Sequence, residues 1–335
     1  MYLLAFESSC DDTSVALLRD DELVCMKTHT QLEHIQTAGV VPETAARLHA
    51  NHIFDLLTQV LAAGNITIKD IDVFVATSEP GLIPSLLIGK TVAKTLATSH
   101  KKPLIWVNHI EGHIFSVLLE RKLEDIQFPA LVLSASGGHN DLFLWKSLYE
   151  IEKLGWTRDD SAGESMDKVG RSMGLSFPAG REVDELAQKY NPEIHINIPK
   201  FPLVLPADSL DFSFSGLKSA AIREITLRKE KLWDLSENDR IEIAYGYQSI
   251  VTEILTQRVI QASKIYQAQT ICLVGGVSAN SALRTKVEQF WKEVQIPVLL
   301  PKSLKYCGDN AAMIGIRAYW EYKKKFITII LCTKI

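Results

Sequence analysis

The chain has 335 residues, of which 47% are hydrophobic and 23% are charged, and its formal net charge is −4. This length allows two globular domains with cores of their own, and the slightly negative charge means that any RNA-binding surface must be a local patch. The 5 cysteines are scattered and never form a C-x-x-C pair, which favours reduced thiols over a disulfide framework. No signal peptide and no apolar run of about 18 residues is expected, so we expect a cytoplasmic protein without a membrane role.

The first half of the chain alternates strand-like and helix-like segments. An apolar strand leads into the polar turn Glu7-Ser-Ser-Cys-Asp-Asp-Thr13, and a helix is expected from about Pro42, a residue that suits a first helical turn. The hydrophobic pattern predicts strands at 2–7, 15–18, 23–28, 72–77 and 104–107, and helices at 42–63 and 84–99, with a further helix that carries His109.

The second half restarts with the same order of elements. Its first turn is the glycine-containing segment Ser136-Gly-Gly-His-Asn140. Strands are expected at 130–134, 142–145, 150–156, 271–274 and 298–300, and helices at 163–174, 181–189, 216–230, 237–265, 279–291 and 309–323. The β-prone run Phe326-Ile-Thr-Ile-Ile-Leu-Cys332 is expected to form a terminal strand or a poorly ordered end.

The alternation of strands and helices predicts the α/β class. Its repeated order resembles the duplicated βββαβα core of the actin, sugar kinase and heat-shock chaperone ATPase superfamily, although a generic doubly wound fold alternates in a similar way. The resemblance implies two domains and an interdomain cleft in which the turns 8–13 and 136–140 face each other. We expect a first domain at 1–128 that is completed by a C-terminal helix at 309–325, a second domain at 129–308, and a tail at 326–335.

The pair His109 and His113 is the most informative feature of the sequence. Two histidines four residues apart lie on one face of a helix, where both imidazoles can reach one metal ion, and Asp309 is the best candidate for a third ligand. The alternative is a polar helix face without a metal. A zinc peptidase would need a glutamate directly after the first histidine, but Ile110 holds that place, and Glu111 should point away from the metal face.

Several other segments contain residues that suit an anion or a nucleotide. Ser136-Gly-Gly138 lies between two strands, where glycine amides can approach a phosphate, and Gly275 to Asn280 joins a strand to a helix start. Asp167 lies on a probable helix, and Gly180 with Asp184 lies at the start of the next one, where a carboxylate suits ribose hydroxyls. Ordinary hairpin turns, helix caps and solvated charges are the alternatives for these segments.

Two further segments allow a functional and a structural interpretation. In the first turn, Asp11 could orient a nucleophile or a metal-bound water, or the turn could simply be capped. The segment Asp211-Phe-Ser-Phe-Ser-Gly-Leu-Lys218 precedes a helix with Arg223 and Arg228. These basic residues form a candidate track for RNA, and the alternative is a pair of buried aromatic residues beside an exposed basic helix face.

Taken together and in order, these motifs resemble the tRNA N6-adenosine threonylcarbamoyltransferase family (TsaD, formerly annotated O-sialoglycoprotein endopeptidase). The resemblance runs from residue 2 to about residue 323. It is carried by Glu7-Ser-Ser-Cys-Asp-Asp-Thr13, Gly39-Val-Val-Pro-Glu43, Pro80-Gly-Leu-Ile83, Asn108-His-Ile-Glu-Gly-His113, Ser136-Gly-Gly-His139, Ala162-Gly-Glu164 with Asp167-Lys168, Asp211-Phe-Ser-Phe-Ser-Gly-Leu-Lys218, Gly275-Gly-Val277 with Ala279-Asn280, and Asp309-Asn-Ala-Ala-Met313.

The resemblance implies a transferase that moves the threonylcarbamoyl group from threonylcarbamoyl-AMP to N6 of the adenosine next to the anticodon. The tRNAs read codons that begin with A, the product is t6A, and AMP is released. One divalent metal per subunit, Fe²⁺ or else Zn²⁺, is implied on His109, His113 and Asp309. The substrate is implied on Ser134, Ala135, Ser136, Gly137, Gly138, Asp167, Gly180, Asp184 and Asn280.

The implied partners are tRNA, a paralogous dimer partner and the small ATPase of the bacterial t6A system. We name Asp11 as the candidate catalytic residue that orients the incoming amine. A metallopeptidase and a non-catalytic nucleotide-binding scaffold remain alternatives. The chain departs from the usual family pattern at Glu79, Asn140, Ala179, Arg181 and Gly308, and these departures concern the neighbourhood of the nucleotide and one adjoining surface.

Overall fold

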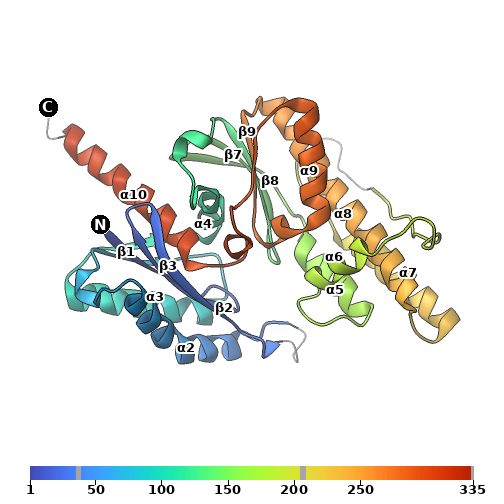
Figure 1. The fold of residues 1–335 in the computed structure, drawn as a ribbon, viewed down its shortest axis with the longest axis horizontal. Coiled ribbons are helices and arrows are strands. Elements are labelled where there is room, and N and C mark those ends of the chain that lie inside the picture. Colours follow the sequence, from blue (N-terminus) through green and yellow to red (C-terminus); the bar gives the residue numbers. More distant parts are fainter. Residues whose placement is uncertain (35–38, 204–208, 333–335) are drawn as a thin grey trace. The chain divides into compact units, whose positions relative to one another are not determined.

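The computed structural model describes residues 1–34, 39–203 and 209–332. The chain divides into two compact units (Figure 1). The first unit contains Met1–Leu123 and Pro301–Ile335, and the second contains Glu124–Leu300. Each unit is built on one five-stranded sheet.

The sheet of the first unit has the strand order β3-β2-β1-β4-β5. Strand β1 pairs antiparallel with β2 and parallel with β4, and β4 pairs parallel with β5. Strands β1 and β4 are almost wholly buried, as expected for central strands with helices on both faces. The strands are β1 (Tyr2–Glu7), β2 (Asp12–Arg19), β3 (Glu22–Thr30), β4 (Val73–Thr77) and β5 (Leu104–Val107).

The sheet of the second unit has the order β10-β9-β6-β7-β8, which repeats the first arrangement element by element. Strand β6 pairs antiparallel with β7 and parallel with β9, as β1 pairs with β2 and β4. The strands are β6 (Ala130–Ala135), β7 (Asn140–Ser147), β8 (Glu150–Trp156), β9 (Thr270–Val274) and β10 (Val298–Leu299). The predicted α/β class and the predicted duplication of the element order are therefore confirmed.

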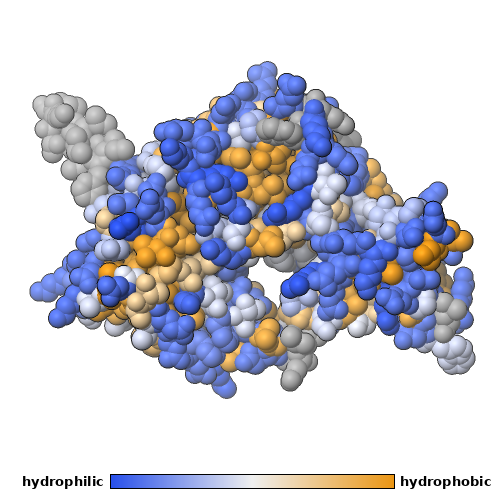
Figure 2. All heavy atoms as spheres, viewed as in Figure 1, coloured by the Kyte–Doolittle hydropathy of each residue, from blue (hydrophilic) through white to orange (hydrophobic). Residues whose placement is uncertain are grey.

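Helices cover both faces of the first sheet. Helices α2 (Pro42–Ala63) and α3 (Ile83–His100) pack on the face that presents Phe6 and Leu17. Helix α10 (Ala311–Cys332) packs on the opposite face, where a Cβ at Gly315 would lie 2.3 Å from Leu18. The outer side of α2 is mostly hydrophilic in Figure 2, as an amphipathic surface helix requires. A short helix, α4 (His109–Phe115), follows β5.

The core of the second unit lies between its sheet and five helices. Strand residues such as Leu131, Leu133 and Leu142 pack with apolar residues from each of these helices. The helices are α5 (Ala162–Ser172), α6 (Gly180–Gln188), α7 (Ser215–Leu232), α8 (Glu237–Tyr266) and α9 (Ser281–Val294).

The end of the chain differs from the expectation. The run 326–332 is not a strand, because α10 continues through it to Cys332. Adding a residue to a helix that has already formed is much less costly than starting one, so a β-prone run can extend a preceding helix. The last three residues of the predicted tail, 333–335, lie outside the described residues. None of the described helices is both long enough and apolar enough to span a membrane.

Candidate functional site

Helix α4 places two histidines on one buried face. Asn108 caps the helix, since its side-chain oxygen accepts hydrogen bonds from the amides of Ile110 at 2.9 Å and Glu111 at 3.3 Å. His109 and His113 are both buried, and their rings meet edge to face with centroids 4.7 Å apart. The four-residue spacing thus brings two imidazoles to one point, as a metal site requires.

Asp309 joins the two histidines from the far end of the sequence. Its Oδ1 atom lies 3.1 Å from Nε2 of His113 and 3.4 Å from Nε2 of His109. One nitrogen from each histidine and one carboxylate oxygen all lie within 4.8 Å of one another. These three residues could hold one metal ion, and a site with only three protein ligands leaves positions open for substrate.

The close packing of α4 against the start of α10 explains how Asp309 reaches the histidines. Gly112 faces α10, and a Cβ there would lie 2.7 Å from Cδ1 of Ile314. The first turn of α10 is anchored from two sides: the Asn310 side chain accepts from the Met313 amide, and the Ala311 amide donates to Oγ of Ser14, both at 3.0 Å. Asp309 is therefore presented by a fixed helix start.

A buried carboxylate, Glu7, orients His109 from behind. Nδ1 of His109 lies 3.3 Å from Oε2 of Glu7 and 3.2 Å from Oγ of Ser9. Glu7 is itself held by the Ser9 amide at 2.6 Å and by the Thr77 hydroxyl. Because these partners occupy Nδ1, Nε2 is the nitrogen that faces Asp309, which is the carboxylate–histidine arrangement typical of metal sites.

The charges at this centre favour a cation. Burial alone would lower the pKa of His109, but the carboxylates of Asp309 and Glu7 outweigh burial and raise this pKa to about 10. Burial would likewise raise the pKa of Asp309, but the two histidines hold it well below its usual range. Nδ1 of His113 is buried and has no hydrogen-bond partner among the described residues. Two imidazoles and a carboxylate under a strong negative potential fit a divalent ion such as Fe²⁺ or Zn²⁺.

The substitution Glu7→Gln should weaken metal binding without removing a metal ligand. The amide keeps the shape of the side chain but loses the charge that orients His109. Loss of such an outer partner typically lowers metal affinity by about 10- to 100-fold. Competition with a metal chelator measures this affinity, and an unchanged affinity would show that Glu7 has only a packing role.

The first turn carries Asp11 next to this centre. Ser9 touches His109, and Asp11 follows two residues later between β1 and β2. Burial and then the neighbouring charges of Asp11 and Asp309 raise the pKa of the Cys10 thiol, which keeps this cysteine protonated. The first turn thus lies within the electrostatic reach of Asp309.

Glu111 does not take part in the centre. Its carboxylate accepts a hydrogen bond from Nε of Arg317 at 2.7 Å, on α10. This contact supports the prediction that Glu111 points away from the metal face, and it leaves a peptidase mechanism without its general base.

In the second unit, the glycine turn is exposed and open. Oγ of Ser136 accepts hydrogen bonds from the amides of Gly138 at 3.3 Å and His139 at 3.1 Å, and the Ser161 hydroxyl donates to the Gly137 carbonyl at 2.6 Å. A Cβ at Gly137 or Gly138 would meet no atom within 4 Å. Ser134 and Ala135 are buried at the end of β6. The turn is therefore held in shape while its glycines leave room for a ligand.

Two other glycines allow this turn to pack closely on its neighbours. A Cβ at Gly163, in the first turn of α5, would lie 2.5 Å from the Ser136 carbonyl oxygen. A Cβ at Gly275, where φ is +84°, would lie 2.4 Å from the Ala135 carbonyl oxygen. Only glycine fits at either position, so these two glycines allow their backbone to lie directly against the Ser136 and Ala135 carbonyl groups.

The remaining predicted nucleotide residues are linked by hydrogen bonds. Asp167 accepts from the Gly180 amide at 2.9 Å. Asp184 accepts from the Ser281 hydroxyl at 2.6 Å and from Gln248 at 2.9 Å, and Asn280 donates to Gln248 at 3.0 Å. Gln248 and Ser281 carry no recognisable motif, so sequence reasoning missed them. The helix-cap alternative for Asn280 is also observed, because its Oδ1 accepts from the Leu283 amide at 3.0 Å.

Two of the three residues of the predicted basic track, Lys218 and Arg228, have acidic partners within the chain. Arg228 is engaged by Glu224, Asp239 and Glu242 at 2.7 to 2.9 Å, and Lys218 pairs with Asp160. Asp160, Asp239 and Glu242 come from other segments of the chain, whereas Glu224 lies one turn away on the same helix. Together they offset the positive charges that the helix sequence suggested. The buried-aromatic interpretation of the preceding segment is confirmed, since Phe212 and Phe214 are fully buried.

Solved structures of low sequence identity share this fold. One is component A of (R)-2-hydroxyglutaryl-CoA dehydratase from Acidaminococcus fermentans, with a TM-score of 0.56 and 13% identity. The match covers 96% of this chain and 98% of that protein's chain. Another is HypF from T. kodakarensis, with a TM-score of 0.60 and 12% identity. The match covers 96% of this chain and 48% of that protein's chain. Both are actin-like ATPase-type folds, which agrees with the duplicated sheet order.

Sequence comparison shows closer relatives. Proteins named tRNA N6-adenosine threonylcarbamoyltransferase match nearly the whole chain. The protein from Limosilactobacillus reuteri is 40% identical, and the match covers 96% of this chain and 91% of the relative. The proteins from Kosmotoga olearia and Streptococcus pneumoniae are 40% and 41% identical, the matches cover 97% of this chain in both cases, and they cover 94% and 93% of the respective relatives. The model of the TsaD family, described as tRNA N6-adenosine threonylcarbamoyltransferase, matches residues 22–316. The chain therefore belongs to the tRNA N6-adenosine threonylcarbamoyltransferase family and is a transferase.

Proposed function

We propose that this protein transfers the threonylcarbamoyl group from threonylcarbamoyl-AMP to N6 of the adenosine next to the anticodon, in tRNAs that read codons beginning with A. The convergence of His109, His113 and Asp309 carries the proposal, since it supplies a centre with open positions in a chain of this family. A C–N bond forms between N6 and the carbamoyl carbon, the bond from that carbon to the phosphate oxygen breaks, and N6 loses a proton. AMP leaves with the electron pair.

Each set of residues has a proposed role. A bound metal, Fe²⁺ or else Zn²⁺, would supply Lewis acidity toward the substrate carbonyl or the phosphate. His109, His113 and Asp309 would hold this metal, and Glu7 fixes the ring of His109. We further propose that the turn 134–138 binds the phosphate and that Asp167, Gly180, Asp184 and Asn280 bind the nucleoside.

Positioning should contribute more to catalysis than proton abstraction. The exocyclic amine of adenine is a weak nucleophile, because its lone pair is delocalised into the ring. Holding it in line with the carbamoyl carbon, in a preorganised electrostatic environment, lowers the barrier most effectively. Asp11 is the proposed residue that orients this amine; it lies in the first turn, in which Ser9 contacts His109.

Release of AMP tests the proposed reaction. The purified chain with its partner proteins is incubated with threonylcarbamoyl-AMP, with and without unmodified tRNA, and AMP is followed by chromatography. We expect AMP release to depend on tRNA. Peptide cleavage without such release would favour the metallopeptidase, and binding of threonylcarbamoyl-AMP without AMP release would favour the scaffold.

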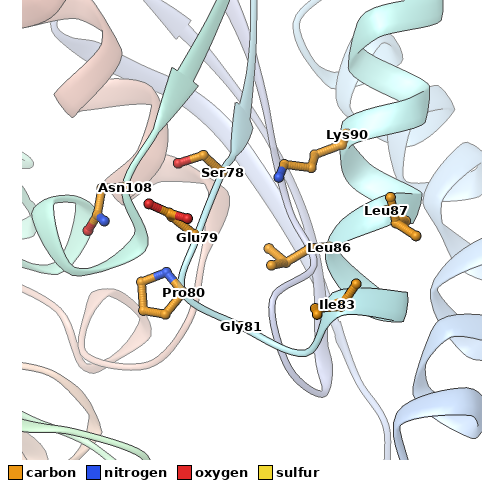
Figure 3. A pocket seen from close by; sticks show the side chains of 9 residues that line it. All are labelled: Ser78, Glu79, Pro80, Gly81, Ile83, Leu86, Leu87, Lys90 and Asn108. Atoms are coloured by element: carbon orange, nitrogen blue, oxygen red, sulfur yellow. The ribbon is translucent and has the colours of Figure 1, made fainter.

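We propose that the partner proteins, a paralogous dimer partner and a small ATPase, contact the helices of the first unit. A pocket of about 440 Å³ lies between the β4–α3 loop and α3, with Glu79 and Lys90 on opposite sides (Figure 3). Around it, Ile83 is 73% exposed, Leu87 55% and Trp106 43%. Exposed apolar side chains flanked by opposite charges are typical of protein-binding surfaces.

The substitution Leu87→Glu should weaken binding of the dimer partner. It places a charge in the middle of the exposed apolar group, and truncation or charging of a central interface residue costs about 2 kcal/mol or more in binding. Calorimetric titration of the partner into the variant measures the effect. Leu227→Glu is the matched control, because Leu227 is an exposed leucine on α7 of the second unit. Equal losses in both variants, or no loss at Leu87, would contradict this assignment of the surface.

A further inference from the structure

A buried histidine on α2 is bonded to the first turn at two points. Nε2 of His49 lies 2.9 Å from the carbonyl oxygen of Cys10, and its Nδ1 lies 2.7 Å from the hydroxyl oxygen of Thr13. The side chain is fully buried among the apolar residues that line this face of α2. Its two hydrogen-bond partners, Cys10 and Thr13, directly precede and follow Asp11 and Asp12 in the sequence.

The partners fix the tautomer of His49. A carbonyl oxygen can only accept, so Nε2 must carry the proton and donate it to Cys10. In the neutral ring Nδ1 then accepts, and the Thr13 hydroxyl donates to it. Burial lowers the pKa of His49, which agrees with a neutral ring. Both polar atoms of the imidazole are thus used to hold the turn.

The peptide that follows Asp11 is held from the same face of α2. The carbonyl of Asp11 accepts a hydrogen bond from the Gln31 amide at 3.1 Å, and the Gln31 side chain donates to the carbonyl of Ala45 at 3.1 Å. Ala45 lies one helical turn before His49. The peptide groups on both sides of Asp11 are therefore anchored to one stretch of α2.

The other end of the turn is anchored to α3. The Ser9 carbonyl accepts from the Leu82 amide at 2.7 Å, and the Ser8 hydroxyl donates to the Ser85 carbonyl at 2.9 Å. A Cβ at Gly81 would lie 2.7 Å from the Ser9 carbonyl oxygen, so this contact is as close as the backbone permits. Together with the bonds from His49, these contacts restrict the conformation of the backbone on both sides of Asp11.

We propose that His49 is a positioning residue for the transfer reaction: by fixing the Cys10–Asp11 peptide it sets the direction of the Asp11 carboxylate toward the incoming amine. This inference rests on the proposed function. A small displacement of a catalytic group lowers the rate strongly, because the reacting geometry is lost in the transition state while substrate binding is retained.

A double-mutant cycle with Asp11 tests the proposal. His49→Leu removes both hydrogen bonds at similar volume, and we expect kcat to fall by between about 10- and 100-fold with KM and metal content nearly unchanged. In an Asp11→Asn background the same substitution should lower kcat no further, because the carboxylate that it positions is already gone. His49→Gln, which can donate to the Cys10 carbonyl again, should restore part of the rate.

The matched control is His52→Leu, on the same helix, since His52 stacks on His29 and not on the turn. It should leave kcat unchanged. An equal loss from His49→Leu with and without the Asp11 carboxylate would overturn the proposal and leave His49 a purely structural role. If His49→Leu does not fold, Thr13→Val removes one of the two bonds and should show the same non-additivity.

Hydrogen exchange separates this inference from the proposed function. In His49→Leu, amide exchange should rise in the segment 8–13 and stay unchanged in α3. Unchanged exchange in the turn would overturn the positioning role even if the wild-type chain forms t6A. Failure of the wild-type chain to form t6A, with exchange raised as expected, would instead refute the proposed function and leave the anchorage of the turn standing.

Discussion

Replacing Asp309 with alanine should deplete the metal centre and lower t6A formation by more than about 100-fold. Loss of a residue that only hydrogen-bonds to a metal ligand already lowers metal affinity or activity by about 10- to 100-fold, so loss of a ligand itself should lower them more. His109 and His113 would remain, but they would lack the carboxylate that now lies 3.4 and 3.1 Å from their respective Nε2 atoms. Elemental analysis of the purified variant and a t6A assay measure the two effects.

Glu111→Gln is the matched control for this prediction. Glu111 lies between the two histidines on α4, but its carboxylate is bonded to Arg317. The variant should keep both its metal and its t6A activity. Loss of metal from Glu111→Gln, or full metal content in Asp309→Ala, would contradict the assignment of the ligands.

Replacing Gly163 with alanine should impair nucleotide binding while the metal is retained. The new Cβ would lie 2.5 Å from the Ser136 carbonyl oxygen and 2.9 Å from Cα of Gly137, and both are backbone atoms that cannot rotate away. The turn must shift, at a cost of about 1–3 kcal/mol in the free energy of unfolding. We expect KM for threonylcarbamoyl-AMP to rise by about 10-fold or more, because each 1.4 kcal/mol of lost binding is a factor of ten.

Gly216→Ala controls for the helix position. Gly163 and Gly216 are each the second residue of a helix, but a Cβ at Gly216 would meet no atom within 4 Å. This variant should bind substrate normally and be slightly more stable, since alanine favours the helix over glycine. An unchanged KM in Gly163→Ala would show that the glycine turn does not bind the substrate.

Most of the fold could be predicted from the sequence. Hydrophobic runs bounded by polar turns placed the central strands and long helices, because burial on one or both faces leaves a periodic pattern. Leu104–Val107 and Pro42–Ala63 have the bounds expected from that pattern. The run 326–332 was misinterpreted, because its β-branched residues say nothing about the helix that precedes it and extends through it.

The candidate site was harder to predict, because many of its contacts join distant segments. His109 and His113 are visible through their spacing alone, whereas Glu7 meets His109 across 102 residues and Gln248 meets Asp184 across 64. No local pattern records such contacts. For the same reason the sequence did not predict the acidic partners of Arg228, which include Asp239 and Glu242 on the next helix.

Nucleoside mass spectrometry tests the central claim most directly. Unmodified tRNA is incubated with threonylcarbamoyl-AMP, the partner proteins and either the wild-type chain or His109→Ala, and its nucleosides are then analysed. We predict t6A with the wild-type chain and none with the variant. Absence of t6A with a metal-loaded wild-type chain and active partners, or equal t6A in both reactions, would contradict a metal-dependent transfer by this protein.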